Sequence, residues 1–323
     1  MTRIFVYEFA SGSAPSHLGA ELMQAGTAMR DAIVGDLLQL PCVATTCAVG
    51  SLRRAGFPPS VSGRKPAMAG PQMGEDCFAF VRRVAERHDL SWIVAPETDG
   101  TLARMHDTVG ASAWIGCSGD AIRTASSKSA TSAALDAFGI PTARSLTSAA
   151  KRWIVKPDDG AGTLDTRVHS TRESALTDLC QRERDGRRAT LEPFVDGEPM
   201  SISMVVGGRK PGPVAFNRQR IEIDGEGLMH DVGVIGGAIL AQSDARVPQL
   251  QALACAVMRA LPGLKGYVGL DLVWHPERGP VVMEVNPRVT CAYVGLSERL
   301  DRNIAAEIVS MHLRRKTPDA ALA

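Results

Sequence analysis

Apolar positions follow two different patterns along the 323-residue chain. In the first third, short and wholly apolar runs are each followed by a polar turn and then by apolar positions at helical spacing. The runs predict strands at residues 4–7, 42–46, 92–95 and 113–115. The spacing predicts helices at residues 18–29, 77–87 and 98–105. This repeated order of strand, turn and helix predicts an open parallel α/β sheet.

The remaining two thirds of the chain contain adjacent β-rich runs. One apolar run ends at Lys156, and a loop with Gly160 and Gly162 leads from it into a second run. Residues 190–206 form two more β-rich runs joined by Asp-Gly, a pair typical of tight hairpin turns. An amphipathic helix is predicted from residue 247 onwards, and another helix over residues 297–313.

A strongly apolar segment near the end predicts a hairpin with strands at residues 267–274 and 280–285. A turn centred on residues 276–279 sets a register that pairs Trp274 with Val281, Asp271 with Glu284 and Gly269 with Asn286. Two carboxylates directly opposite each other repel, and with an amide oxygen on the same side they suit a hard cation such as Mg²⁺. The hairpin is therefore predicted to bind metal. A surface hairpin with scattered acids is the alternative.

The charge balance limits the partners of the chain. With 36 basic and 35 acidic residues, no overall field attracts nucleic acid or an anionic membrane, so small-molecule substrates are expected. The seven cysteines are odd in number and lack CxxC spacing, which argues against a disulfide framework and a zinc site. No run approaches the ~20 apolar residues of a membrane span. We therefore expect a cytoplasmic protein, and whether it forms a homodimer stays open.

Three motifs, in order, resemble ATP-grasp enzymes. A lysine precedes an alanine-rich helix that ends at G-I-P-T, a lysine strand leads into the glycine loop, and MEVNPR follows the predicted metal strand. The resemblance implies ATP as cofactor, with Mg²⁺ or Mn²⁺ held by Asp271, Glu284 and Asn286. It also implies nucleotide roles for eight residues: phosphate binding by Lys128 and Lys156, loop closure by Gly160 and Gly162, adenine binding by Glu192, Phe194 and Val195, and ribose binding by Glu198.

The same resemblance implies the fold and its division. The α/β fold of such a chain has an N-terminal open parallel sheet domain, residues 1–125, followed by a two-lobed α+β ATP-grasp domain. Residues 126–196 form the small subdomain, and residues 197–323 form the C-terminal subdomain with the metal and catalytic residues.

The resemblance also implies a reaction. ATP-grasp ligases convert a carboxylate into an acyl-phosphate, which an amine then attacks to form an amide. The segments RIFVYEFASG, APETDG and FNRQRI are most similar to the tyramine–glutamate ligases of methanofuran-type cofactor synthesis, which implies L-glutamate and tyramine as substrates. Two alternatives remain open, namely a small-molecule kinase and a nucleotide-binding module without turnover.

Three arginines are predicted to be catalytic. Arg218 and Arg220 alternate and so share one face of a strand, and Arg288 lies two residues beyond Asn286. Forked guanidinium groups match the oxygens of a phosphoryl group or an acyl-phosphate. D-alanine ligases place an arginine two residues before the metal aspartate, but Gly269 stands there in this chain. For Arg218 and Arg220, pairing with a nearby acid is the alternative.

Ligands of parallel sheets bind beyond the carboxyl ends of the strands. Glu8 and Ser11 follow the first predicted strand, and Glu97 follows the third. These residues are predicted to contact the substrate, and ordinary helix caps and turns are the alternative. The segment 57–75, rich in proline and glycine, is predicted to be either mobile or a functional lid.

Overall fold

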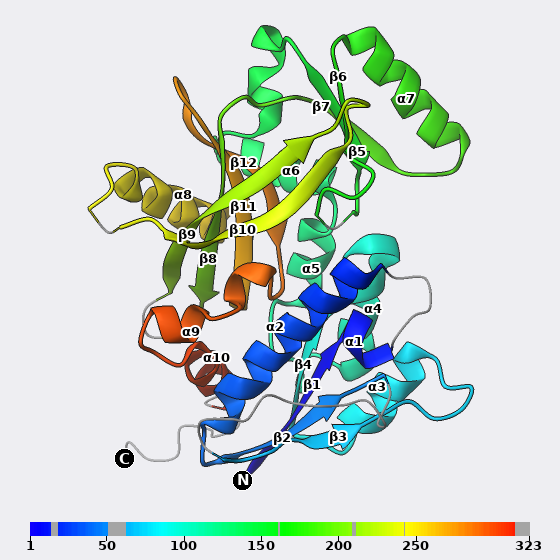
Figure 1. Cartoon of the computed structure of the whole chain (residues 1–323), viewed down its shortest axis with the longest axis vertical. Helices are drawn as coiled ribbons and strands as arrows, with labels where there is room; N and C mark the ends of the chain where they lie inside the picture. The colour runs from blue at the N-terminus through cyan, green and yellow to red at the C-terminus, as the bar shows by residue number, and fades with distance from the viewer. Residues whose placement is uncertain (14–18, 51–62, 161, 209–210, 242, 314–323) are drawn as a thin grey trace.

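The computed structural model describes the chain except residues 14–18, 51–62, 161, 209–210, 242 and 314–323. Within the described residues the strands form three sheets, in the orders β3-β2-β1-β4, β6-β5-β7 and β10-β9-β8-β11-β12. Figure 1 shows the first of these sheets at the bottom, the three-stranded sheet with α7 at the top, and the five-stranded sheet to the left between them. The predicted succession of a parallel α/β sheet and a two-lobed α+β region is confirmed.

The N-terminal sheet is parallel and consists of β3 (Ala67–Ala69), β2 (Val43–Ala48), β1 (Thr2–Glu8) and β4 (Leu90–Val94). The helices beside it are α2 (Ala20–Leu38), α3 (Cys77–Ala85), η1 (Thr98–Gly100), α4 (Thr101–Val109) and α5 (Gly119–Ala125). Alternate residues of β1 point to opposite faces. Ile4 and Val6 pack against α2, whereas Phe5 and Tyr7 pack against α3 and α4. Helices thus bury both faces, which explains the wholly apolar runs.

Two predictions for this region are wrong in detail. The polar turn after β1 is a short helix, α1 (Phe9–Ser13). Residues 113–115 form no strand, because Trp114 makes only an isolated parallel bridge to Ser91. Of the segment 57–75, residues 57–62 lie outside the described residues, and the remainder contains the edge strand β3, which pairs with β2.

The three-stranded sheet is antiparallel and is built around its central strand. It consists of β6 (Arg167–His169), β5 (Trp153–Pro157) and β7 (Ala189–Pro193), and the neighbouring helices are α6 (Lys128–Asp136), η2 (Ala143–Ala149) and α7 (Arg172–Arg184). Its apolar core is small, with Trp153 and Val155 packed against Ala175 of α7. A sheet with so small a core depends on polar contacts to position its loops.

The large sheet is antiparallel and consists of β10 (Met229–Ile239), β9 (Gly212–Ile223), β8 (Glu198–Val206), β11 (Gly266–His275) and β12 (Gly279–Asn286). Helix α8 (Val247–Ala260) covers one face, where Leu250 and Val257 share a core with Met200, Leu270 and Leu272. The chain continues through η3 (Cys291–Tyr293), α9 (Leu296–Arg299) and α10 (Ile304–Leu313). The single helix predicted over residues 297–313 is therefore wrong, because Asp301 adopts a left-handed conformation between α9 and α10.

The predicted hairpin at Asp196–Gly197 is also wrong. Strand β7 pairs with β5, whereas β8 pairs with β9 and β11, so the two runs belong to different sheets. The local preference of Asp-Gly for a tight turn is overridden by longer-range strand pairing. The segment between the two runs instead connects the sheets. Within the part of the chain that the structure describes, no helix is both long and apolar enough to cross a bilayer.

Candidate nucleotide and metal site

The hairpin of β11 and β12 has the predicted register at its functional end. Asp271 pairs with Glu284 and Gly269 with Asn286, as predicted, but Trp274 pairs with Pro280 and not with Val281. The turn is one residue shorter than predicted, and the register shifts back between Asp271 and Leu272. The extra residue in β12 is Met283.

This bulge decides which way Glu284 points. In regular alternation Val282 and Glu284 would share a face, but the extra residue at Met283 reverses the alternation. As a result Val282 and Val285 both enter the core under α8. Glu284 is thereby directed to the opposite face, together with its partner Asp271.

A row of polar side chains crosses this opposite face of the large sheet. Ser201 pairs with both Asn217 and Asp271, which continues the row to Glu284. Side-chain contacts confirm the shared face, because the Asn217 amide lies 3.4 Å from the Ser201 hydroxyl. Gln219, two residues beyond Asn217, donates from Nε2 to Asp271 Oδ1 at 3.0 Å.

Asp271, Glu284 and Asn286 present an oxygen-rich donor set. Asn286 donates from Nδ2 to Asp271 Oδ2 at 2.8 Å, so its amide and the Asp271 carboxylate are adjacent. Two carboxylates and an amide oxygen are hard ligands that fit Mg²⁺ or Mn²⁺. The described residues contain no group of three or more histidine, cysteine, aspartate or glutamate side chains arranged for a metal, so any metal here relies on two carboxylates and an amide.

Lys128 reaches this row from the start of α6. Ser127 caps that helix by accepting a hydrogen bond from the backbone of Ala130, and Lys128 is buried at 6% exposure. Its Nζ donates to the carbonyl of Gly160 and lies 3.3 Å from Glu284 Oε1. One predicted phosphate lysine, the glycine loop and one predicted metal carboxylate therefore meet at a single ammonium group.

Lys156 lies on the central strand of the small sheet. Its Nζ is 2.7 Å from Glu192 Oε2, and both side chains are more than nine-tenths buried. Strands β5 and β7 position this pair, with Lys156 opposite Thr190 and Glu192 opposite Ile154. One predicted phosphate residue and one predicted adenine residue are thus brought together. Their contacts with a nucleotide stay a prediction.

The remaining predicted nucleotide residues have mixed environments. Val195 is buried against Ala143 and Val281, and the Phe194 ring lies 4.0 Å below the Arg152 guanidinium group. In the glycine loop, Gly162 has a left-handed backbone. A Cβ at Gly160 would lie 3.0 Å from the ring of Pro157. Glycine is therefore favoured at both loop positions.

The structure does not bring Glu198, Arg218 and Arg220 together with the metal carboxylates. Arg218 pairs with Met200, whose side chain is buried under α8, so Arg218 faces away from Asp271. Its Nε is 2.8 Å from Glu198 Oε1, and Arg246 at the start of α8 holds the other Glu198 oxygen at 2.6 Å.

Arg220 lies two residues beyond Arg218 and shares its face. It is largely exposed and forms an ion pair with Glu222 at 2.6 Å. Both arginines therefore adopt the acid-paired arrangement that the sequence left open. Arg218 and Arg220 share one face of β9, as predicted. This face is opposite to the one that carries Asp271.

Arg288 has a different setting. It makes a two-pronged contact with Glu97, from Nε to Oε1 and from Nη2 to Oε2, each at 2.8 Å, and Glu97 is only 2% exposed. Burial lowers the pKa of Arg288, but the negative charges of Glu97 and Glu284 raise it more, so its pKa lies above its usual value. The carboxyl edge of the N-terminal sheet thus touches the end of the metal strand.

The other substrate candidates are engaged within the N-terminal domain. Glu8 accepts hydrogen bonds from the backbone of Ala10 at 3.0 Å and of Ser11 at 2.7 Å. A Cβ at Gly26 of α2 would overlap its carboxylate. Glu8 therefore caps α1, which is the alternative that the sequence left open. The Ser11 hydroxyl is buried and has no hydrogen-bond partner among the residues that the structure describes, so it is a polar group that a ligand could satisfy.

Sequence reasoning missed Ser201, Asn217 and Gln219 on the polar row. The alternation in FNRQRI contained the signal, because Asn217 and Gln219 alternate with the two arginines along the strand. Deciding whether the amides or the arginines of this strand face the site requires the register between β9 and β8. Neither segment alone encodes that register.

Comparison with known proteins defines the class. Residues 125–292, just over half of the chain, match the ATP-grasp domain family, and residues 64–122 match the pre ATP-grasp 3 domain. The protein belongs to the ATP-grasp family. The landmarks named above, from Lys128 to Asn286, all lie within the matched region.

Two curated relatives are tyramine–L-glutamate ligases. The protein of Methanocaldococcus jannaschii is 28% identical over 215 residues, which cover 66% of this chain and 59% of that protein. The protein of Methanocaldococcus fervens is 26% identical over 213 residues, covering 65% of this chain and 62% of that protein. The matched region thus spans about three-fifths of the length of these relatives.

Solved structures share the fold. An ATP-grasp superfamily protein of Archaeoglobus fulgidus superposes with a TM-score of 0.70 at 20% identity, covering 96% of this chain and 88% of that one. D-alanine–D-alanine ligase of Bacillus anthracis superposes with a TM-score of 0.65 at 16% identity, covering 98% of both chains.

Proposed function

We propose that the protein is an ATP-dependent ligase that joins a carboxylic acid to an amine. The observation that carries the proposal is the meeting of Lys128 with Glu284 and with the glycine loop, beside the paired Asp271. A cation, a glycine-containing loop and two opposed carboxylates are the groups that bind the phosphates and metal of ATP. The two relatives named as tyramine–L-glutamate ligases support the same class of reaction.

Asp271, Glu284 and Asn286 would hold the divalent ion, Mg²⁺ or Mn²⁺. When bound, such an ion would neutralise the charge of the phosphate oxygens and orient the γ-phosphate. Lys128 and Lys156 would exchange Glu284 and Glu192 for phosphate oxygens, so each lysine has a carboxylate partner that keeps it paired before ATP arrives. Such preorganisation reduces the rearrangement that binding requires.

The reaction would proceed in two steps. A carboxylate oxygen of the acid attacks the γ-phosphorus, which releases ADP and leaves an acyl-phosphate. The amine then attacks the acyl carbon, and inorganic phosphate leaves with the former carboxylate oxygen. Arg288 is the arginine best placed to stabilise the charge of the acyl-phosphate, because it lies two residues beyond Asn286 and is held firmly by Glu97.

The substrate pair that we propose is L-glutamate and tyramine. The names of the two relatives support it, as do the short segments at the N-terminus, at APETDG and at FNRQRI that resemble such ligases. Glu97 lies at the carboxyl edge of the N-terminal sheet, beside the end of the metal strand. This edge would therefore line the acid and amine positions.

Release of ADP from ATP in the presence of paired acids and amines tests the proposal. L-Glutamate with tyramine should give ADP and an amide in equal amounts, and Asp271→Asn should abolish both. Hydroxylamine in place of the amine should give a hydroxamate, because only an activated carboxylate reacts with it. Phosphorylation of a hydroxyl without hydroxamate would replace the ligase with a kinase, and absence of turnover with every pair would contradict both.

A further inference from the structure

The glycine loop is held at both ends. Its N-terminal end carries Gly160, whose carbonyl accepts from Lys128, and Asp158, which accepts from the backbone of Ser129 at the start of α6. Its C-terminal end is the root, defined here as residues 165–168, which includes the start of β6. The N-terminal contacts belong to the phosphate site already described, whereas those of the root lie outside it.

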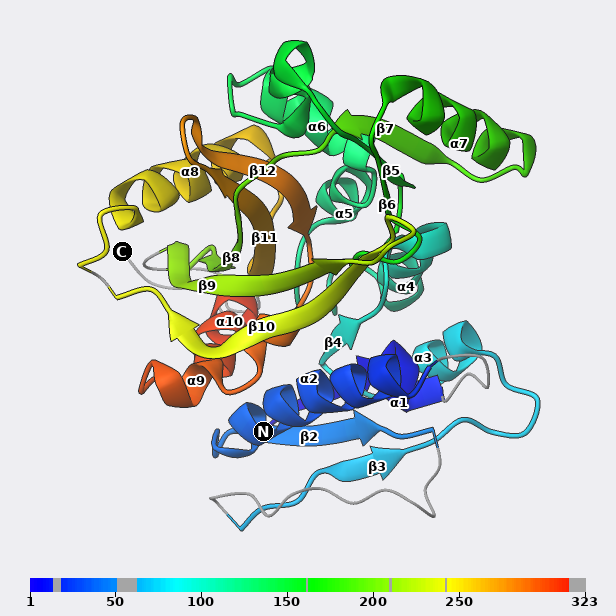
Figure 2. The same ribbon diagram turned by 45° about the horizontal axis from the view of Figure 1, so that its top comes forward.

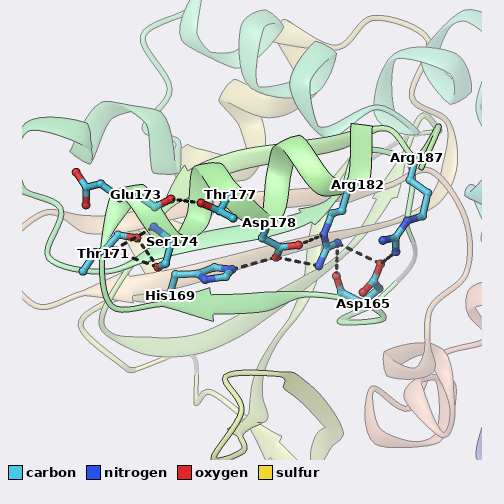
Figure 3. A network of polar contacts seen from close by, with 9 residues as sticks. All are labelled: Asp165, His169, Thr171, Glu173, Ser174, Thr177, Asp178, Arg182 and Arg187. Atoms are coloured by element: carbon cyan, nitrogen blue, oxygen red, sulfur yellow. Dashed lines mark hydrogen bonds and ion pairs between the residues drawn. The ribbon is translucent and has the colours of Figure 1, made fainter. Parts of the chain in front are cut away.

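Arg182 of α7 holds the root through hydrogen bonds (Figure 3). Its Nη1 donates to the Asp165 carbonyl at 2.7 Å and to Asp165 Oδ2 at 3.1 Å, and its Nε donates to Asp178 Oδ1 at 2.8 Å. The guanidinium group is nearly buried, with the residue at 3% exposure. Arg187 contacts the same Asp165 oxygen at 3.0 Å, and His169 lies 3.0 Å from Asp178 Oδ2.

The backbone at the root is unusual. Asp165 has φ of 52°, a left-handed conformation that a residue with a Cβ adopts at a cost. Such a conformation persists only where its surroundings hold it, and the Arg182 contact to the Asp165 carbonyl is a direct means of doing so. Arg182 is buried but Asp165 is exposed, and an ion pair with an exposed partner contributes little net stability. Its use here favours a role in fixing geometry.

The large sheet holds the same root from the other side. Val168 donates to the Gly227 carbonyl at 2.7 Å, and Met229 donates to the Thr166 carbonyl at 2.9 Å. These contacts come from the tip of the β9–β10 hairpin, residues 224–229, and Figure 2 shows this tip beside β6. The hairpin is the element that carries Asn217 and Gln219 on its site face. The root therefore joins the small sheet to the strand that reaches the metal carboxylates.

We propose that Arg182 is a positioning residue that, with the β9–β10 tip, fixes the root of the glycine loop and thereby strengthens the binding of ATP phosphates. The inference rests on the proposed function, since it takes ATP as the ligand that the loop covers. Arg182 touches no reacting atom. It acts through Asp165, whose carbonyl and carboxylate it holds together.

Two variants test the root from its two sides. Arg182→Gln removes the fork, and Arg184→Gln on the exposed side of the same helix is its control. Gly227→Ala would place a Cβ on the Val168 carbonyl, while Gly225→Ala, two residues earlier with nothing within 4 Å of its Cβ, is the control. If Arg182→Gln fails to fold, Gly227→Ala still tests the same root.

Amide hydrogen exchange of residues 163–168, measured without nucleotide, reports the root itself. We expect about tenfold faster exchange in Arg182→Gln and in Gly227→Ala, from the loss of a charged hydrogen bond or of the backbone contacts, and no change in either control. Arg182→Lys should restore little, because an ammonium group cannot hold Asp165 and Asp178 at once. Unchanged exchange in both test variants would overturn the inference whatever the enzyme does.

ATP titration of the same proteins reports the coupling to nucleotide. We expect the Kd for ATP to rise about tenfold to a hundredfold in the test variants while kcat at saturating ATP falls much less, because bound ATP reorders the loop. Faster exchange with an unchanged Kd would overturn the inference and leave the proposed function intact. A wild-type protein that binds no ATP would overturn the proposed function, and with it the role of the root toward phosphates.

Discussion

The two faces of the large sheet are built from the same strands but differ in chemistry. On one face, Asp271 and Glu284 oppose each other inside a row that also contains Ser201 and Asn217. On the other, Leu270 and Leu272 pack under α8. The polar face carries groups whose mutual repulsion destabilises the sheet, and the apolar face supplies the burial that offsets it. The difference supports the proposal that the polar face binds a metal ion.

Charged residues occur on both faces, and their partners distinguish them. Glu198, Arg218 and Arg246 form a cluster at the rim of the α8 face, where each charge is matched within 2.8 Å. On the polar face Asp271 and Glu284 are two like charges directly opposite each other, and Lys128 lies 3.3 Å from Glu284. A cluster of alternating charges stabilises the fold modestly, whereas two opposed carboxylates suit a cation.

The largest expected effect comes from comparing the same substitution, aspartate to asparagine, on the two faces. Asp271→Asn should lower kcat by about 10³ or more, since several kcal/mol of charge stabilisation are lost with the metal ligand. Asp244→Asn, beside Arg246 on the α8 face, should change kcat less than about threefold. ADP formation at saturating ATP measures both. Equal losses in the two variants would remove the distinction between the faces.

The stability of the protein, unlike its activity, should not fall when a charge on the polar face is removed. Asp271→Asn removes one of two opposed carboxylates, so the free energy of unfolding should stay equal or rise by up to about 1 kcal/mol. Denaturant unfolding of the two aspartate variants measures it. A large loss of stability in Asp271→Asn would mean that its effect on kcat reflects misfolding.

Arg288 extends the comparison to the end of the metal strand. Arg288→Ala should lower kcat by about 10²–10³, as expected for one preorganised donor, and raise KM for the acid much less. Arg288→Lys should recover little, because a point charge cannot reproduce the two contacts to Glu97. Initial rates against acid concentration separate kcat from KM. Near-normal kcat in the alanine variant would assign the transition-state charge to another group.

Adjacent residues of β9 give a sharper and smaller contrast. Gln219→Leu should raise the Mn²⁺ concentration for half-maximal binding about tenfold or more, since Gln219 orients Asp271. Arg218→Leu, one residue earlier on the opposite face, should leave it unchanged. Calorimetric titration with Mn²⁺ measures this without turnover. The reverse result would mean that the faces are assigned the wrong way round.

The limits of sequence reasoning follow from the same strands. The pairing of Asp271 with Glu284 could be predicted because a single short turn fixes it. The prediction succeeded although its turn was one residue too long, because the bulge at Met283 compensates. The role of Arg218 could not be judged in this way. Its face depends on pairing between β8 and β9, and alternation within one strand cannot supply that register.

The hairpin predicted at Asp196–Gly197 failed for a related reason. The turn preference of this pair is local, whereas β7 pairs with β5 in the small sheet and β8 pairs with β9 in the large sheet. Likewise Glu97 could be proposed from its place after a strand, but its contact with Arg288, 191 positions away, arises only from the docking of two domains. Contacts across one short turn were thus predictable, and contacts between elements distant in the sequence mostly were not.

The smallest effect concerns the pH dependence of the α8 face. Hydrogen bonds from Arg246 hold the pKa of Asp244 well below its ordinary value of 3.8. A carboxylate with a lowered pKa contributes stability that is present above the unfolded pKa and is lost as the pH falls toward the folded one. Asp244→Asn should therefore lower Tm slightly at pH 7, and the difference from wild type should shrink as the pH falls below about 4. Thermal unfolding from pH 7 to pH 3 measures it. A difference that is constant across this range would show that Asp244 acts through packing and not through its charge.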